Sequence, residues 1–189
     1  MKTPCKFASL IGLLVVILSG CAERCDDFEY SITDWMPYKT NDRIIIESNN
    51  IIDSLTVNYS VINHTDKIQF GAKCICENSF SINLASANLD IYIRFDDAKD
   101  LTQSEIQLND EFLAFSEQVN SAIIDGITYT NVLIFVNRNQ ESSANYQQVI
   151  VAKDIGIVAI ISAEDEWVIT DGSRRQVESS DIEFISLDC

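Results

Sequence analysis

Cysteine is the residue type with the greatest chemical potential in this sequence, and four of the six cysteines could act together. Cys74 and Cys76 flank a single isoleucine, while Cys25 and Cys189 lie towards the two ends of the chain. Apolar and polar residues alternate from Lys67 to Cys76, so in a strand both thiols of the pair point to the apolar face. Their Cα atoms would be about 6.6 Å apart and poorly aimed at each other, so we expect each cysteine to take a distant partner.

A Cys-X-Cys pair can also bind a metal ion or perform redox chemistry. A structural zinc site takes four ligands, usually as two close pairs. Here the second pair is missing, and the only histidine, His64, is ten residues away from Cys74. A redox-active thiol needs a stabilised thiolate, commonly at a helix N-terminus, and the residues around Cys74 carry no such signal. The sequence therefore favours structural disulfides and predicts no metal ion and no cofactor.

Residues 1–20 are predicted to be a signal peptide. Lys2 and Lys6 precede an uncharged apolar run of 12 residues, Phe7–Leu18, which is too short to span a bilayer. The run ends in Leu18-Ser19-Gly20-Cys21, which resembles the lipobox of bacterial lipoproteins, where the cysteine thiol is acylated and the chain is cut just before it. This resemblance implies that Cys21 becomes the first residue of the mature protein. Its fatty chains, such as palmitate, would hold the protein in a membrane.

The residues after Cys21 bear on where such a lipoprotein would reside. Position 22 is alanine, not the aspartate that retains many lipoproteins at the inner membrane of diderm bacteria. The resemblance therefore implies the cell envelope, with the protein anchored in the outer membrane and facing the periplasm or the cell surface. Residues 21–29 form an acidic tether, which is compatible with the export signal of Bacteroidota surface lipoproteins and equally with a solvated linker.

Export also bears on the cysteines, because disulfides form in oxidising compartments. Cys5 leaves with the signal peptide and Cys21 carries the lipid, which leaves four cysteines and three possible pairings. We predict two disulfides that join the chain ends to the Cys74 and Cys76 strand. The candidates are Cys25, Cys74, Cys76 and Cys189.

Composition limits the partners. The 189 residues include 29 acidic and 13 basic side chains, for a net charge of −16, and removal of Lys2 and Lys6 with the signal leaves 11 basic against 29 acidic, or −18. Such a chain does not have the clustered lysine and arginine that neutralise phosphates, so no nucleic acid is expected. It also repels anionic head groups, so only the lipid on Cys21 is expected to hold the membrane. A hydrophobic fraction of 47% argues against disorder.

No catalytic residue is predicted. His64 lies in a polar break between two strand patterns and is expected to be an exposed turn residue. Two acidic clusters, Asp96-Asp97 with Asp100 and Glu164-Asp165-Glu166, are expected to be solvated loops, because they do not have the spacing of a calcium-binding EF-hand. The alternative is a small carboxylate-dependent hydrolase or a calcium-binding enzyme built on these clusters.

Residues 30–189 are predicted to form a single β-rich domain. Apolar and polar residues alternate in three segments typical of half-buried antiparallel strands, Leu55–Val61, Phe80–Leu84 and Leu89–Phe95. In the first segment this alternation assigns Tyr59 to the apolar face. Two further runs, Val132–Val136 and Ile155–Ile161, are apolar on both faces and should be covered on both sides.

One segment departs from this pattern, since Asn109–Val119 carries Phe112, Phe115 and Val119 at helical spacing and predicts a short helix. Asp125-Gly126 is a strong turn signal, because glycine accepts a positive φ. The predicted fold class is all-β: an antiparallel meander of about eight to ten strands forming a curved half-barrel, barrel or sandwich, with at most one short helix.

From Ile127 to Ile169, the strand patterns around Tyr129–Val132, Tyr146–Lys153 and Ile155–Val158 resemble the C-terminal half of small Bacteroidota lipoproteins. This resemblance covers about a quarter of the chain and implies a curved half-barrel like that of periplasmic lipoprotein carriers. The sequence therefore predicts a lipid-anchored, non-enzymatic envelope lipoprotein, a binding or structural module for an apolar ligand or a protein partner.

Overall fold

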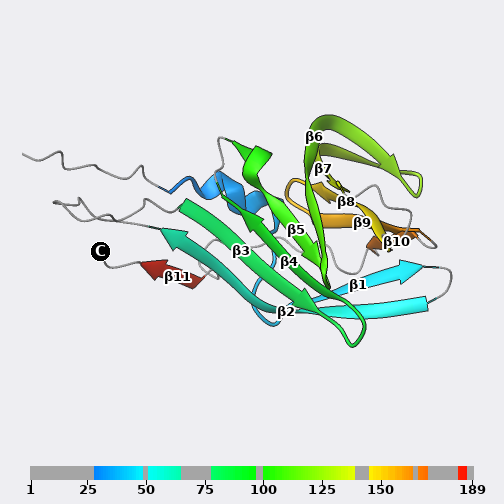
Figure 1. Ribbon diagram of the computed structural model, residues 1–189, viewed down its shortest axis with the longest axis horizontal. Helices are drawn as coiled ribbons and strands as arrows, with labels where there is room; N and C mark the ends of the chain where they lie inside the picture. The colour runs from blue at the N-terminus through cyan, green and yellow to red at the C-terminus, as the bar shows by residue number, and fades with distance from the viewer. Residues whose placement is uncertain are drawn as a thin grey trace, which may run out of the picture.

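The computed structural model describes residues 28–48, 51–64, 78–96, 100–138, 145–163, 166–169 and 183–186. Strands dominate these residues, with two short 3₁₀ helices (Figure 1). In chain order the elements are η1 (Tyr30–Trp35), β1 (Arg43–Ser48), β2 (Ile51–His64), β3 (Asn78–Ala85), β4 (Asp90–Phe95), η2 (Leu101–Gln103), β5 (Glu105–Leu108), β6 (Glu111–Ile124), β7 (Ile127–Asn137), β8 (Tyr146–Ala152), β9 (Gly156–Ser162), β10 (Glu166–Ile169) and β11 (Glu183–Ser186). Neither helix in this part of the chain is long and apolar enough to cross a bilayer.

Strands β1 to β10 form a closed antiparallel meander barrel. Each strand pairs with the next in sequence, and β1 pairs with β10 as well as with β2, which closes the ring. Among the described residues the closure is short, with β1 and β10 sharing the register pairs Ile46–Ile169 and Glu47–Val168. Strand β11 lies outside the ring, parallel to the second half of β2. The all-β antiparallel meander is confirmed, and of the half-barrel, barrel and sandwich it is the barrel.

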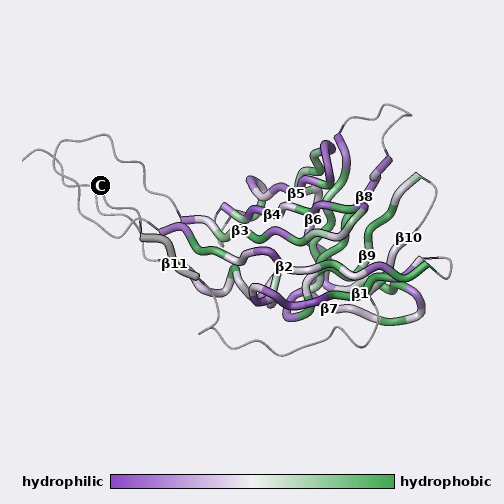
Figure 2. The backbone as a smooth tube through the Cα atoms, turned by 90° about the horizontal axis from the view of Figure 1, so that it is seen from below, coloured by the Kyte–Doolittle hydropathy of each residue, from purple (hydrophilic) through white to green (hydrophobic). Residues whose placement is uncertain are grey.

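The hydrophobic pattern explains why these strands enclose a core. In β4 and β5 alternate side chains are buried, whereas β9 is apolar over most of its length, as the colouring in Figure 2 shows. A strand covered on one face needs apolar residues only at every second position, while a strand covered on both faces needs them throughout. The expectation that Val132–Val136 and Ile155–Ile161 are covered on both sides is confirmed.

The main core fills the inside of the barrel. Three phenylalanines lie at its centre, with ring centroids of Phe80 and Phe95 6.4 Å apart and those of Phe95 and Phe135 also 6.4 Å apart. All three rings are fully buried among isoleucine, leucine and valine side chains from β1 to β9. Burial of this kind is the principal source of stability in a domain of this size.

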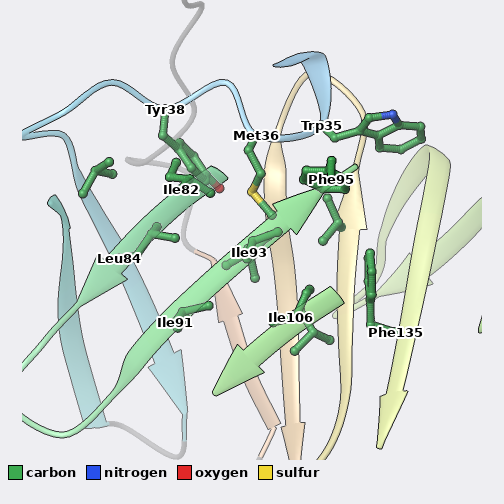
Figure 3. Packing of buried hydrophobic residues seen from close by; sticks show 14 of the residues in the cluster. Trp35, Met36, Tyr38, Ile82, Leu84, Ile91, Ile93, Phe95, Ile106 and Phe135 are labelled. Atoms are coloured by element: carbon green, nitrogen blue, oxygen red, sulfur yellow. The ribbon is translucent and has the colours of Figure 1, made fainter. Parts of the chain in front are cut away.

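Helix η1 and the segment after it close one end of the barrel. Trp35 and Met36 point from this segment onto the strands, above Phe95 and Ile93 in Figure 3, and Tyr38 packs into the same core. Trp35 is buried in this contact.

The same end of the barrel is fixed to the β8–β9 turn. The N–H of Asp154 donates to the carbonyl of Asp34 at 2.6 Å, and Lys153 Nζ lies 3.3 Å from an Asp34 carboxylate oxygen. Gly156, which follows that turn, has φ of +94°, and a Cβ there would overlap the ring of Tyr38. Glycine is therefore required at this position both for the backbone conformation and for the close approach of Tyr38.

A second, smaller core lies on the outside of the barrel. The β6–β7 hairpin is longer than its neighbours and curls over β8 and β9 (Figure 1), burying Ile124 and Tyr129 against Ile150 and Val158. The predicted turn at Asp125-Gly126 is confirmed, with φ of +46° and +73°. These values suit the two-residue turn of a hairpin.

The helix predicted at Asn109–Val119 is wrong, because these residues form the β5–β6 turn and the first half of β6. Asn109 adopts φ of +51°, which starts a two-residue hairpin turn and not a helix cap. Leu113 is then buried in the barrel while Phe112 points outwards. Helical spacing of the aromatic residues was coincidental, and pairing on both sides of β6 decided its conformation.

Candidate functional site

The residues for which chemistry was predicted lie mainly outside the described part of the chain. This holds for the lipidation site Cys21 and for the disulfide candidates Cys25, Cys74, Cys76 and Cys189. Lipidation and both disulfides therefore stay predictions.

The prediction for His64 is wrong, because it is the last residue of β2 and is half-buried, not an exposed turn residue. Its Nδ1 lies 2.5 Å from Oδ1 of Asn78, its neighbour on β3, and its ring contacts that of Phe28. The strand continues further than the polar Asn63-His64-Thr65 sequence suggested, because pairing with β3 and β11 satisfies its backbone groups.

The described acidic residues of the first cluster have structural partners. Asp96 Oδ1 is 2.5 Å from Nε of Arg94, and Asp100 accepts hydrogen bonds from the hydroxyl and the N–H of Thr102 at the start of η2. These two bonds lower the pKa of Asp100. Asp97 and the loop residues Glu164 and Asp165 lie outside the described residues. Within the described ranges, no three histidine, cysteine or acidic residues come together as a metal site.

The surface with a distinct chemical pattern lies on the outer face of β2 to β6. Five residues, one from each strand, are register neighbours across the sheet: Tyr59 with Asn83, Asn83 with Tyr92, Tyr92 with Gln107, and Gln107 with Phe112. An aromatic ring alternates with an amide along this line. We call these five residues the aromatic–amide row.

The row is accessible to a partner. Phe112 is 58% exposed and Tyr59 is 38% exposed, while Asn83, Tyr92 and Gln107 between them are half-buried. Neighbouring strands are about 4.8 Å apart, so the Cα atoms of consecutive aromatic residues in the row are separated by roughly 10 Å. A phenylalanine this exposed, set in a line with two tyrosines, is more informative than a single exposed leucine or isoleucine elsewhere.

A β-bulge in β2 brings Tyr59 into the row. The register with β3 shifts between Val57 and Tyr59, which makes Asn58 the extra residue. Before the bulge Val57 faces the core, and after it Ser60 and Ile62 are buried while Tyr59 faces outwards. The simple alternation that assigned Tyr59 to the apolar face is therefore wrong, since one extra residue exchanges the two faces of a strand.

The bulge leaves a polar group in the barrel. Ser60 is fully buried, and its hydroxyl has no hydrogen-bond partner among the described residues. An unsatisfied buried hydroxyl costs about 1–3 kcal/mol. The bulge that turns Tyr59 outwards therefore costs stability, because it places the Ser60 hydroxyl in the core.

Hydrogen bonds hold the polar side chains of this face in place. Asn58 Nδ2 donates to Asn83 Oδ1 at 2.6 Å, and Asn83 Nδ2 donates in turn to Asp90 Oδ1 at 2.6 Å. Gln107 Nε2 donates to the carbonyl of Asn109 at 2.8 Å. The amides of the row are therefore oriented before any partner arrives.

The tyrosines of the row influence each other. Partial burial, followed by the proximity of Tyr92 and Asp90, raises the pKa of Tyr59, which keeps its hydroxyl neutral as a donor and acceptor at neutral pH. The hydroxyls of Tyr92 and Ser81 are 3.3 Å apart. The face thus presents neutral hydroxyls and amides between flat rings.

Glu111, beside Phe112, fixes the end of the row. Its carboxylate accepts from the N–H groups of Asn145 and Tyr146 and from the side-chain amides of Asn137 and Asn145, at 2.9–3.2 Å. Burial alone would raise the pKa of Glu111, but these four hydrogen bonds outweigh it and lower the pKa. The start of β6 is thereby tied to the start of β8.

Sequence reasoning did not find the row. The alternating strands identified Asn83, Tyr92 and Gln107 as outward positions, but only the register places them beside one another. Phe112 carried a signal that was misread, because an apolar residue directly after a turn was assigned to a helix.

Comparison with protein-family models, curated proteins and solved structures finds no match to this chain.

Proposed function

We propose that this protein is a lipid-anchored, non-enzymatic binding module of the cell envelope, attached to the outer membrane through Cys21. The aromatic–amide row would be the surface that meets its partner. The observation that carries the binding role is the exposed phenylalanine Phe112 in register with two tyrosines on one sheet face. The sequence Leu18-Ser19-Gly20-Cys21 supports the anchor.

The packing of the barrel favours a partner on the outside. The interior side chains of β2 to β9 are buried against one another, with Phe80, Phe95 and Phe135 at the centre. A protein that carries an apolar ligand needs a concave apolar space, and here the protein's own side chains fill the barrel. We therefore expect the purified full chain to show no saturable uptake of a fluorescent fatty acid, measured by titration; saturable uptake would contradict an external site.

Lipidation at Cys21 is testable with a close control. The full gene is expressed in a diderm bacterium fed with an alkyne-tagged palmitate, and the protein is examined for label and for its membrane fraction. We expect Cys21→Ser to lose both the label and membrane attachment, because the proposal places the lipid on this thiol. Cys25→Ser, four residues away, should keep both. Label that persists in Cys21→Ser would refute the anchor.

A further inference from the structure

We propose that the aromatic–amide row binds a neutral, linear oligosaccharide laid across β2 to β6, with sugar rings over Tyr59, Tyr92 and Phe112. The inference rests on the part of the proposed function that assigns partner binding to the row. It adds the chemical class of the ligand and is independent of the anchor at Cys21.

The rings provide the first element of sugar recognition. The C–H face of a pyranose is apolar and weakly positive, and it packs on the negative face of an aromatic ring. Tyr59, Tyr92 and Phe112 occupy every second strand of the sheet, so the backbone positions of the three platforms follow one another at roughly 10 Å intervals. This spacing suits a chain that places every second sugar ring on a platform.

The amides provide the second element. Sugar hydroxyls both donate and accept hydrogen bonds, and an amide side chain offers both functions. Asn83 and Gln107 lie between the rings, and Asn58 is bonded to Asn83 beside Tyr59. Because their hydrogen bonds already fix these amides, little side-chain entropy is lost when a ligand binds.

The charge of the row and of its surroundings favours a neutral ligand. None of the five side chains in the row is charged; Asp90 and Glu105 flank it on β4 and β5, with Arg94 opposite Glu105, and the whole chain carries a net charge of −16. An anionic glycan, a phosphorylated lipid or a nucleic acid would be repelled by this field. A neutral oligosaccharide is not repelled.

The pattern fits a sugar chain better than a protein partner. The energetic centre of a protein interface is a contiguous apolar cluster that becomes fully dry on binding. In the row each ring is separated from the next by an amide, and an apolar partner would bury the acceptor capacity that remains on Gln107 Oε1 and on Asn83 Oδ1. Sugar hydroxyls can donate to these oxygens.

The test is calorimetric titration of the purified full chain, in a detergent without a sugar head group, with cellohexaose, xylohexaose and mannohexaose. At least one of these neutral β-linked hexasaccharides should bind with a Kd of about 1 mM or tighter. Tyr59→Ala and Phe112→Ala should each weaken that binding about tenfold, since each removes one platform. Tyr59→Phe keeps the ring and should bind within about threefold of the original chain.

The matched control is Ile123→Ala, which removes a side chain that is 74% exposed at the β6–β7 hairpin, away from the row. It should bind like the original chain, and circular dichroism should show that every variant is folded. Absence of binding to all three sugars overturns the inference and leaves the test of Cys21 unaffected. Sugar binding that persists in both Tyr59→Ala and Phe112→Ala overturns the assignment of the row, and with it the binding part of the proposed function.

Discussion

Two groups of aromatic rings in this barrel differ in what surrounds them. Inside, Phe95 and Phe135 contact each other and the aliphatic side chains of neighbouring strands, and neither is exposed. Outside, Tyr59 and Phe112 belong to the aromatic–amide row, in which amides separate the rings and solvent reaches them. The inner rings therefore contribute to stability through burial, and the outer rings are free to contribute to recognition.

The largest expected effect is a difference in the stability of variants that remove an inner ring or an outer ring. Phe135→Ala should lower the free energy of unfolding by about 4 kcal/mol, because it removes a fully buried ring and leaves a cavity. Phe112→Ala should change it by less than about 0.5 kcal/mol, since most of that ring is already in solvent. Urea unfolding followed by circular dichroism measures both. Equal losses in the two variants would mean that the row is part of the core.

The second prediction concerns the end of the barrel that η1 and the segment after it close. Gly156→Ala should destabilise the protein by about 3 kcal/mol, because the new methyl group overlaps Tyr38 and the backbone has φ of +94°. Gly126→Ala is the control, since its φ is +73° but nothing lies within 4 Å of a Cβ there. The control should lose only about 1 kcal/mol. Thermal or urea unfolding of the pair isolates the contact with Tyr38.

The third prediction tests the bulge that brings Tyr59 to the outer face. Ser60→Ala should raise the free energy of unfolding by about 1 kcal/mol, because it removes a buried hydroxyl that has no partner among the described residues. Ser81→Ala, on the outer face, removes a hydroxyl that faces Tyr92 and should not stabilise the protein. A Ser60→Ala variant less stable than the original chain would show that this hydroxyl is satisfied.

The smallest expected effect is at the edge of the row and depends on pH. The folded pKa of Glu111 lies below its ordinary value of 4.5, so its hydrogen bonds stabilise the protein above pH 4.5 and are lost as the pH falls through the lowered folded pKa. Glu111→Gln should therefore be less stable than the original chain at pH 7, by less than about 1 kcal/mol at this solvent-accessible site.

The difference in stability between the original protein and Glu111→Gln should disappear in acid, because the carboxylate of Glu111 is then protonated and uncharged, like the amide of glutamine. Urea unfolding at pH 7 and at a series of lower pH values measures it. A difference that stays constant over this range would show that shape and not charge matters at Glu111.

Most of the fold followed from local pattern. The alternation in Phe80–Leu84 and Leu89–Phe95 predicted strands with one buried face, and the two-faced apolar runs predicted strands covered on both sides. Asp125-Gly126 predicted its turn because glycine at positive φ is a local requirement. The errors were at Asn109–Val119, at His64 and at Tyr59, where strand pairing overrode a local signal.

The sequence by itself determined the all-β class, the meander and the acidic character, because hydrophobic period, turn residues and charge are properties of neighbouring residues. Only the tertiary structure decided that the sheet closes, since β1 meets β10 across more than 100 residues of chain. It also decided that Tyr59 faces outwards, because the bulge exists only relative to β3. The aromatic–amide row likewise depends on strand register, which places residues from five strands side by side. Register between strands cannot be read from the order of residues along the chain.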